Sequence, residues 1–155
     1  SGTLIELIVV HNISLPPREF GGPGIIDLFL NRLRGDAHPY CAAISHLRVS
    51  AHFLIRRDGE LIQFVPCAMR AWHAGISRWR GRERCNDFSL GIELEGADDI
   101  AFEDAQYVRL RELITATMEG FIEEWRTRAA NRRLTPGSDP ETVGARPAST
   151  FALHG

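Results

Sequence analysis

The chain contains no lysine: all 18 basic residues among its 155 are arginines. No lysine amine is therefore present to act as a nucleophile or a base, which excludes that kind of catalysis. The 20 acidic residues outnumber the basic ones and leave a net charge of −2 at pH 7. That balance gives no electrostatic reason to expect binding to nucleic acid or to a membrane surface.

Cysteines and long apolar runs are also scarce. Cys41, Cys67 and Cys85 are odd in number, widely spaced and without a C-x-x-C pair, so neither a disulfide framework nor a zinc knuckle is expected. The sequence shows neither the apolar core of a signal peptide nor a run long enough to cross a bilayer. These absences predict a cytoplasmic protein, and the length is enough for one domain with a core.

Several catalytic motifs are missing as well. There is no H-E-x-x-H pair, which weighs against a zincin protease, and no G-x-S-x-G turn, which weighs against a serine hydrolase. Neither G-x-G-x-x-G nor a P-loop spacing occurs, so nucleotide binding has no support. Any site must therefore be assembled from side chains that lie far apart in the sequence.

The apolar patterns that are present predict an α/β fold. Buried strands are expected at residues 4–10 and 88–94 because of their runs of β-favouring and alternating apolar residues. Asp58-Gly59 lies between two apolar runs and predicts a hairpin over residues 52–65. We expect this hairpin to belong to the same sheet as the two strands.

Helices are expected in two places. One long helix is predicted over residues 103–126 and packed across one face of the sheet, since apolar residues recur there at spacings of three and four. These residues are Tyr107, Leu110, Ile114, Met118, Phe121 and Trp125. A short helix is predicted within residues 25–33, whereas residues 34–50 are expected to be rich in loops.

His11 and Asn12 follow the first expected strand where it would run out into a loop. An imidazole on a rigid strand end can be a metal ligand, a general base or a substrate contact. The alternative is a core histidine whose hydrogen bonds are satisfied. This segment alone does not decide between the two interpretations.

Two further segments carry groups that suit a site. Alternation in the strand at 88–94 puts Ser89, Gly91, Glu93 and Glu95 on the face opposite to Phe88, Leu90, Ile92 and Leu94. The two carboxylates form either a solvated stripe or, beside a metal, a general base. Trp72 and His73 would suit a sugar or peptide if exposed and would belong to the core if buried.

Longer stretches resemble one family, the AmpD-like 1,6-anhydro-N-acetylmuramyl-L-alanine amidases. They are VVHNISLPP at 9–17, EFGGP at 19–23, AHPY at 37–40, HLRVSAHFLIRRDGELIQFVP at 46–66, RAWHAG at 70–75 and GRERCNDFSLGIELEG at 81–96. The resemblance implies a central mixed β-sheet flanked by helices, a fold also used by peptidoglycan recognition proteins. It further implies zinc-dependent cleavage of the amide bond between the (anhydro)muramyl lactyl group and L-alanine in cell-wall muropeptides, during peptidoglycan recycling.

The resemblance also implies roles for single residues. His11 matches the first zinc ligand of the family, and Glu93 matches the glutamate that acts as general base. The residues in segments that line or support the muropeptide groove are Asn12, Arg48, Trp72, His73 and Arg84. An arginine suits that groove because its fork pairs with the carboxylates of the stem peptide. A structural ion pair is the alternative for either arginine.

The resemblance stops near residue 134, which predicts an amidase-like domain at 1–134 and an irregular tail at 135–155. The family completes its zinc site in a C-terminal segment resembling T-G-H-S-D-I-A-P-G-R-K-T-D-P-G-P, with a second histidine, a catalytic lysine and an aspartate ligand. Here Gly137 stands in place of the histidine, and the lysine and aspartate have no counterpart. Catalytic zinc normally takes three protein ligands, so His11 alone should not hold the metal, and Asp139 and His154 are the candidates for substitute ligands.

Three functions therefore stay open. The chain is a zinc amidase, a muropeptide-binding module without catalysis, or an amidase inactivated by its altered tail. The tail is rich in alanine, proline and glycine and begins abruptly, which is typical of translation in the wrong reading frame. Sequencing the encoding DNA tests that hypothesis, because a correct frame would restore a His, Lys and Asp segment.

Overall fold

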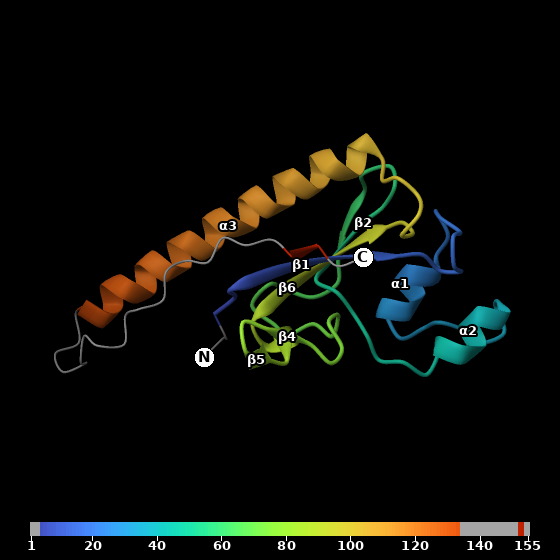
Figure 1. Cartoon of the computed structure of the whole chain (residues 1–155), viewed down its shortest axis with the longest axis horizontal. Helices are drawn as coiled ribbons and strands as arrows, with labels where there is room; N and C mark the ends of the chain where they lie inside the picture. The colour runs from blue at the N-terminus through green and yellow to red at the C-terminus, as the bar shows by residue number, and fades with distance from the viewer. Residues whose placement is uncertain (1–3, 134–151, 154–155) are drawn as a thin grey trace.

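The computed structural model describes residues 4–133 and 152–153 of the chain (Figure 1). Five strands form one mixed sheet in the order β3-β2-β6-β1-β7, and β4 and β5 form a separate hairpin. The strands are β1 (Leu7–Ile13), β2 (Phe53–Ile55), β3 (Leu61–Gln63), β4 (Arg78–Trp79), β5 (Arg82–Glu83), β6 (Ser89–Glu95) and β7 (Ala152–Leu153). The helices are α1 (Gly24–Phe29), α2 (Pro39–Ile44) and α3 (Asp104–Arg133), with a 3-10 turn at Cys85–Asp87. The predicted mixed sheet with flanking helices is confirmed.

The centre of the sheet is the parallel pair of β1 and β6. Its register places His11 opposite Glu93 and Val9 opposite Gly91. β2 lies on the other side of β6, also parallel, and β3 returns antiparallel to β2. Gly59, in the turn between β2 and β3, has a φ of 85°, which suits glycine because it has no β-carbon. The hairpin predicted from the Asp-Gly pair is therefore confirmed.

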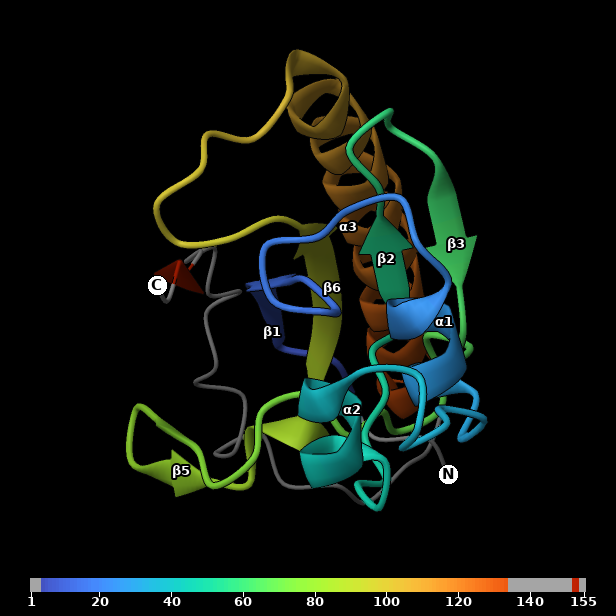
Figure 2. The same ribbon diagram turned by 90° about the vertical axis from the view of Figure 1, so that its right-hand side faces the viewer.

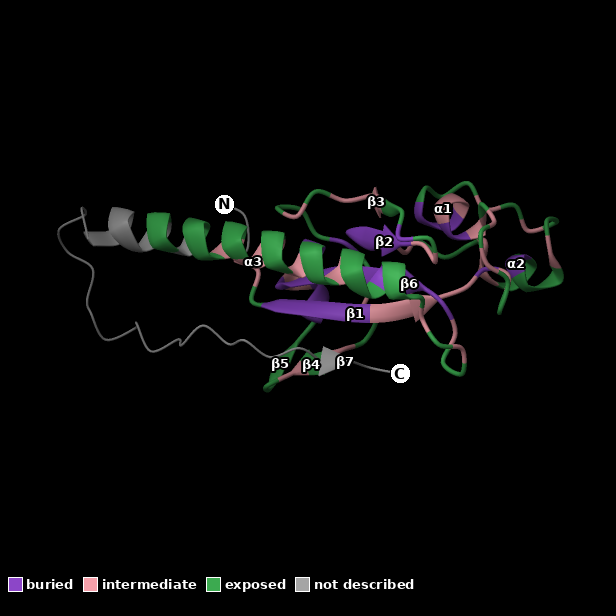
Figure 3. Cartoon of the chain, turned by 90° about the horizontal axis from the view of Figure 1, so that it is seen from above, coloured by how far each residue is buried: buried purple, intermediate pink, exposed green. Residues whose placement is uncertain are grey.

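One face of the sheet is covered by α3, which continues beyond the end of the sheet (Figures 1 and 2). The buried cluster on this face consists of Ile8, Val10, Phe53, Ile55, Leu90, Ile92, Leu94 and Leu113. Leu110, Ile114, Met118 and Phe121 of α3 pack against it, and the opposite side of the helix is exposed (Figure 3). The predicted helix is confirmed, although it extends to Arg133. Tyr107, expected on its apolar face, is instead 54% exposed.

The other face of the sheet carries α1 and α2 (Figure 2). A second buried cluster, which includes Leu54 of β2, contains Ile25, Leu28 and Phe29 of α1. Residues 34–50 are rich in loops, as expected, but they also contain α2, which the sequence did not indicate. Its start depends on two local signals, Pro39 in the first turn and a hydrogen bond of 3.0 Å from the Tyr40 amide to His38 Nδ1. A helix of six residues is too short to show a clear apolar period.

Two expectations for the strands also need correction. β1 begins at Leu7 rather than at residue 4 and continues to Ile13, so His11 lies within the strand instead of behind it. Phe88 does not share the face of Leu90, because the 3-10 turn at Cys85–Asp87 redirects the chain just before β6 begins. Phe88 packs instead with Cys85 and with two residues of β1.

The expected tail is described only at β7, which pairs parallel with β1 opposite Val9 and Val10. The rest of that tail, residues 135–151 and 154–155, lies outside the described residues, so its predicted irregularity stays a prediction. Among the helices in the described part of the chain, none combines the length and the apolar character needed to cross a membrane.

Candidate active site

His11 and Glu93 are the two predicted site residues that the sheet places side by side. They are opposite each other in register on parallel neighbours, so their side chains leave the same face of the sheet. Glu93 is only 7% exposed, and its Oε2 is buried without a hydrogen-bond partner among the described residues. Burial raises the pKa of Glu93 to about 8, because the ionised carboxylate would lose its solvation. A carboxyl group with such a pKa can both accept and return a proton near neutral pH.

His73 lies against His11 on this face. The His11 Nε2 and His73 Nδ1 atoms are 3.0 Å apart, and the two rings meet edge to face with centroids 5.3 Å apart. The ring of His73 rests on Gly91, where a β-carbon would be 2.3 Å from the His73 Cγ. Burial, together with the nearby imidazoles of His11 and His52, lowers the pKa of His73 to about 3. His73 is therefore neutral at physiological pH.

The backbone and ring of His73 are both fixed by residues around the 3-10 turn. Asn86 Oδ1 accepts hydrogen bonds from the amides of His73 at 3.0 Å and Ala74 at 2.9 Å. Ser89 Oγ lies 3.2 Å from His73 Nε2 and donates to the Cys85 carbonyl at 2.6 Å. The position of the ring is consequently set by contacts at both ends of the side chain.

His52 is a fully buried histidine next to this cluster. Its Nδ1 accepts from the Gly91 amide at 3.0 Å, and its Nε2 lies 2.9 Å from the Met69 carbonyl, to which it donates. Burial lowers the pKa of His52, which keeps the ring neutral. Both ring nitrogens are used by the backbone, so His52 is a core residue that supports β6.

A surface groove of about 730 Å³ contains three of the predicted substrate-binding residues, Arg48, Trp72 and Arg84. Trp72 is 53% exposed, which favours the ligand-facing interpretation of this residue over the core one. The groove is rich in positive charge. Its other lining residues are Val49, Arg70, Gly75, Ile76, Ser77, Arg78, Glu83 and Asn86.

Ion pairs organise the arginines at one side of the groove. Asp87 accepts from Arg84, with Nε and Oδ2 3.2 Å apart, and from Arg70, with Nη2 and Oδ1 3.0 Å apart. Arg70 also lies over the ring of Trp72, with its guanidinium carbon 3.8 Å from the ring centre. Arg84 therefore does make a structural ion pair, the alternative role expected for it. Because Arg70 and Arg84 share the single carboxylate of Asp87, net positive charge remains that can attract an anionic ligand.

Asn12 is not brought to this face. It lies one residue beyond His11, so it leaves the opposite side of β1, and its Nδ2 donates to Asp98 Oδ1 at 2.7 Å. Its predicted role in substrate binding is therefore unsupported by the arrangement and stays a prediction. His73 contacts His11 and Arg48 lines the groove, and the predicted roles of both in substrate binding likewise stay predictions.

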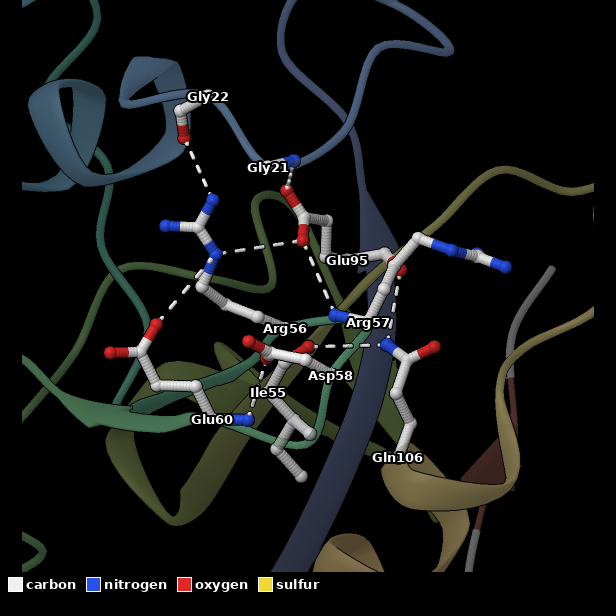
Figure 4. A network of polar contacts seen from close by, with 9 residues as sticks. All are labelled: Gly21, Gly22, Ile55, Arg56, Arg57, Asp58, Glu60, Glu95 and Gln106. Atoms are coloured by element: carbon white, nitrogen blue, oxygen red, sulfur yellow. Dashed lines mark hydrogen bonds and ion pairs between the residues drawn. The ribbon is translucent and has the colours of Figure 1, made fainter.

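Glu95, two positions beyond Glu93, ties the surrounding loops to the sheet (Figure 4). Its carboxylate is 2% exposed and accepts from the Gly21 amide at 2.7 Å and the Arg57 amide at 3.3 Å. Arg56 Nε lies 3.6 Å from the same carboxylate. The interpretation of the two glutamates as a solvated stripe is wrong, because both side chains are covered.

The described residues do not by themselves form a complete metal centre. Within residues 4–133 and 152–153, no three histidine, cysteine, aspartate or glutamate side chains gather closely enough to hold an ion. Catalytic zinc normally takes three protein ligands and a water. Of the predicted ligands, the described part of the chain contains His11. These described residues therefore do not form a zinc site by themselves.

Three residues of the site were not singled out from the sequence. The alternation already placed Ser89 and Gly91 on the strand face of Glu93, but it assigned them no role in the site. Asn86 offers no such signal, since its contact with His73 depends on how two loops meet. The hydrogen bonds by which Asn86 holds the backbone at His73 are visible only in the folded chain.

With this geometry in view, comparison with known proteins defines the class of protein. The sequence matches the N-acetylmuramoyl-L-alanine amidase family over residues 1–138, which is most of its length. The chain belongs to this family, and the AmpD-like resemblance of its motifs is confirmed.

The named relatives include 1,6-anhydro-N-acetylmuramyl-L-alanine amidase AmpD of Salmonella typhimurium, which is 67% identical over 105 residues. The match covers 68% of this chain and 56% of that protein, so the chain spans little more than half the length of this relative. A crystal structure of a selenomethionine AmpD derivative has a TM-score of 0.74 at 62% identity, covering 74% of this chain and 64% of that one.

A more distant solved structure contains a substrate. It is the amidase AmiD from Escherichia coli in complex with anhydro-N-acetylmuramic acid-L-Ala-D-gamma-Glu-L-Lys. It has a TM-score of 0.50 at 27% identity, and the match covers 78% of this chain and 46% of that one.

Proposed function

We propose that the chain hydrolyses the amide bond between the (anhydro)muramyl lactyl group and L-alanine of muropeptides, in peptidoglycan recycling. Membership of the amidase family and the activities in the names of its relatives support this reaction. The observation that carries the proposal is the register of His11 and Glu93 on neighbouring parallel strands, together with the raised pKa of Glu93.

Glu93 is the residue to which we assign proton transfer. Hydrolysis of an amide needs a base that takes a proton from the attacking water and an acid that protonates the leaving nitrogen. Oε2 of Glu93 lacks a hydrogen-bond partner among the described residues, so no competing contact there has to be broken. It can take the proton from water and pass it to the amine of L-alanine.

The basic groove is the surface to which we assign substrate binding. Arg48 and Arg84 would pair with carboxylates of the stem peptide, and the exposed ring of Trp72 would pack against the sugar or the peptide. The AmiD complex with an anhydromuramyl peptide supports a muropeptide as the ligand class. A 1,6-anhydromuramyl peptide is the substrate that we propose.

Zinc is the cofactor we propose, since enzymes of this family are generally zinc amidases. In such enzymes the ion polarises the scissile carbonyl and acidifies a bound water. His11 is the one predicted ligand in the described part of the chain. The other ligands would have to come from outside it, where Asp139 and His154 are the candidates by residue type.

The incomplete ligand set in the described residues favours a second candidate, a muropeptide-binding module without catalysis. One experiment separates the two. The purified full chain is analysed for bound metal, then incubated with 1,6-anhydromuramyl peptide with and without added zinc, and release of free stem peptide is followed by mass spectrometry. Stoichiometric zinc and peptide release support the amidase.

Glu93→Gln is the control for this experiment, because it keeps the shape of the side chain. General acid–base catalysis contributes about 100-fold to 10,000-fold, so the variant should be slower by that factor. Zinc-supplemented protein that releases no peptide contradicts the amidase. If that protein still binds the peptide by calorimetry, the binding module is supported instead.

The cytoplasmic placement expected from cysteine usage stays a prediction.

A further inference from the structure

Asp87 is joined to the groove through two arginine side chains. Arg70 and Arg84 line the groove, whereas Asp87 is not among the described residues that line it. The two oxygens of its carboxylate are divided between these arginines, with Oδ1 3.0 Å from Arg70 Nη2 and Oδ2 3.2 Å from Arg84 Nε. Asp87 therefore lies behind the groove arginines and can act on a ligand through them.

A carboxylate in this place has two opposite effects on an anionic ligand. Its negative charge opposes the positive charge of Arg70 and Arg84, which weakens the attraction of the groove for anions. Its ion pairs, however, hold two long side chains that would otherwise lose their rotational freedom only when the ligand binds. The larger of these two effects decides whether Asp87 hinders or helps binding.

The backbone of Arg84 is already fixed, so its side chain is the part that Asp87 controls. The Arg84 amide donates to the Ser77 carbonyl at 2.9 Å, and the Arg84 carbonyl accepts from the Asp87 amide at 2.8 Å. Arg84 has a φ of 63°, a left-handed conformation that persists only when the surrounding structure holds it. Its side chain is nevertheless 70% exposed, so it is anchored at Nε and remains open to a ligand.

Arg70 extends the same restraint to the ring of Trp72. The guanidinium carbon of Arg70 lies 3.8 Å from the centre of that ring, so a group held by Asp87 covers one face of the indole. The backbone at Trp72 is fixed separately, because its carbonyl accepts from the Ser50 amide at 3.1 Å. The contact with Arg70 therefore sets which face of the ring is open to the groove.

We propose that Asp87 is a positioning residue that holds Arg84, and through Arg70 the ring of Trp72, in the orientation that receives the stem peptide. The freedom that these side chains no longer lose on binding outweighs the attraction that the charge of Asp87 takes away. Removal of this negative charge should therefore weaken the binding of an anion, the reverse of what charge alone would do. This inference rests on the proposed muropeptide-binding function of the groove.

Asp87→Asn tests this sign, because asparagine keeps the shape of the side chain and removes its charge. Calorimetry measures the affinity for anhydro-N-acetylmuramic acid-L-Ala-D-gamma-Glu-L-Lys, the peptide in the AmiD complex. The parent protein and every variant are full chains that also carry Glu93→Gln, which slows cleavage of the peptide during the titration. Ordering one long side chain costs about twofold to twelvefold in affinity, so the release of two arginines should weaken binding about fivefold or more.

Glu83→Gln is the matched control, because it removes the same charge from the groove without releasing an arginine. Glu83 lines the groove, and within the described part of the chain its carboxylate makes neither an ion pair nor a hydrogen bond. This variant should bind as tightly as the parent protein or up to about threefold more tightly. An Asp87→Asn variant that behaves like Glu83→Gln would overturn the proposal, since charge alone would then account for both.

Glu6→Gln shows whether any lost ion pair in this region has the same effect. Glu6 pairs with Arg82 of β5, with Oε1 and Nη1 2.7 Å apart, and neither is among the described residues that line the groove. The affinity of this variant should stay within about twofold of the parent value. Equal losses in Glu6→Gln and Asp87→Asn would mean that a loosened hairpin, and not the groove arginines, explains the result.

A double-mutant comparison tests whether Asp87 acts through Arg84. In an Arg84→Met background one of the side chains that Asp87 holds is gone, so the weakening caused by Asp87→Asn should shrink by about twofold or more. The same weakening in both backgrounds contradicts action through Arg84.

The same titrations separate this inference from the proposed function. A parent protein that does not bind the peptide contradicts the muropeptide-binding function and this inference with it. A parent protein that binds, together with an Asp87→Asn variant that binds equally or more tightly, overturns the positioning role alone.

Discussion

The ring of His73 occupies the space that a side chain at position 91 would need. A β-carbon built on Gly91 lies 2.3 Å from His73 Cγ and 2.4 Å from Cδ2, closer than non-bonded atoms can approach. The close approach of strand and ring therefore depends on the absence of a side chain. It brings His73 within hydrogen-bond distance of His11 and Ser89 at once.

Gly91→Ala should consequently displace His73 and destabilise the chain. Overpacking of a tightly filled site typically costs about 1 to 3 kcal/mol, and we expect a loss in that range in urea denaturation. Gly22→Ala is the matched control, because no atom lies within 4 Å of its β-carbon position. A stability change at Gly91 no larger than that at Gly22 would contradict the close packing.

The pKa of Glu93 predicts an unusual dependence of stability on pH. In metal-free protein the folded pKa is about 8, above the ordinary value of 4.5, so the folded state retains a proton that the unfolded chain releases. Stability should fall as the pH rises from 4.5 through 8, relative to Glu93→Gln, by up to about 5 kcal/mol.

Urea denaturation of both proteins in chelator across this pH range measures the difference. The two stabilities should converge at the acid end, where the carboxyl group is protonated in both states. A difference that stays constant with pH would mean that Glu93 is ionised in the folded chain.

Glu95 should matter for stability even though it is not assigned to the chemistry. Glu95→Gln replaces one acceptor oxygen with an NH₂ group that faces the donors of Gly21, Arg56 or Arg57. Disrupting a buried ionic contact of this kind costs about 3 kcal/mol, measured by urea denaturation. Glu60→Gln, at the exposed ion pair with Arg56, is the control and should cost less than about 1 kcal/mol.

Trp72 should matter for binding and little for folding. Trp72→Ala removes a half-exposed ring from the groove, so we expect affinity for a 1,6-anhydromuramyl peptide to fall about tenfold or more in calorimetry. Tyr107→Ala on α3 removes an aromatic residue of nearly the same exposure, 54% against 53%, outside the groove. Equal losses from the two substitutions would place the ligand elsewhere.

Most of the sheet could be predicted because its signals are local. The Asp58-Gly59 turn sets the β2–β3 hairpin, and the alternation at 88–94 sets the two faces of β6. The family resemblance assigned His11 and Glu93 to one site. The register of β1 and β6 agrees, because it places the two residues opposite each other. The short α2 was missed because its start depends on a capping histidine and a proline instead of a period.

The burial of the site could not be predicted in the same way. Alternation reports which residues share a strand face, but not what covers that face, so Glu93 and Glu95 were left between a solvated and a functional interpretation. The cover of Glu95, for example, comes from a segment distant in sequence, the loop at Gly21, which is 74 residues away. Arg84 both pairs with Asp87, three residues away, and lines the groove. The sequence presented these two roles as alternatives, and only the folded chain shows that Arg84 has both contacts.

The stacking of Arg70 on Trp72 has a practical consequence. The indole is packed on one side by a guanidinium 3.8 Å away and remains more than half accessible at the groove. Indole fluorescence responds to the polarity and charge around the ring, so a molecule that settles in the groove would alter the emission of Trp72. The protein thus carries its own optical reporter of occupancy, and ligand binding can be followed without attaching a dye.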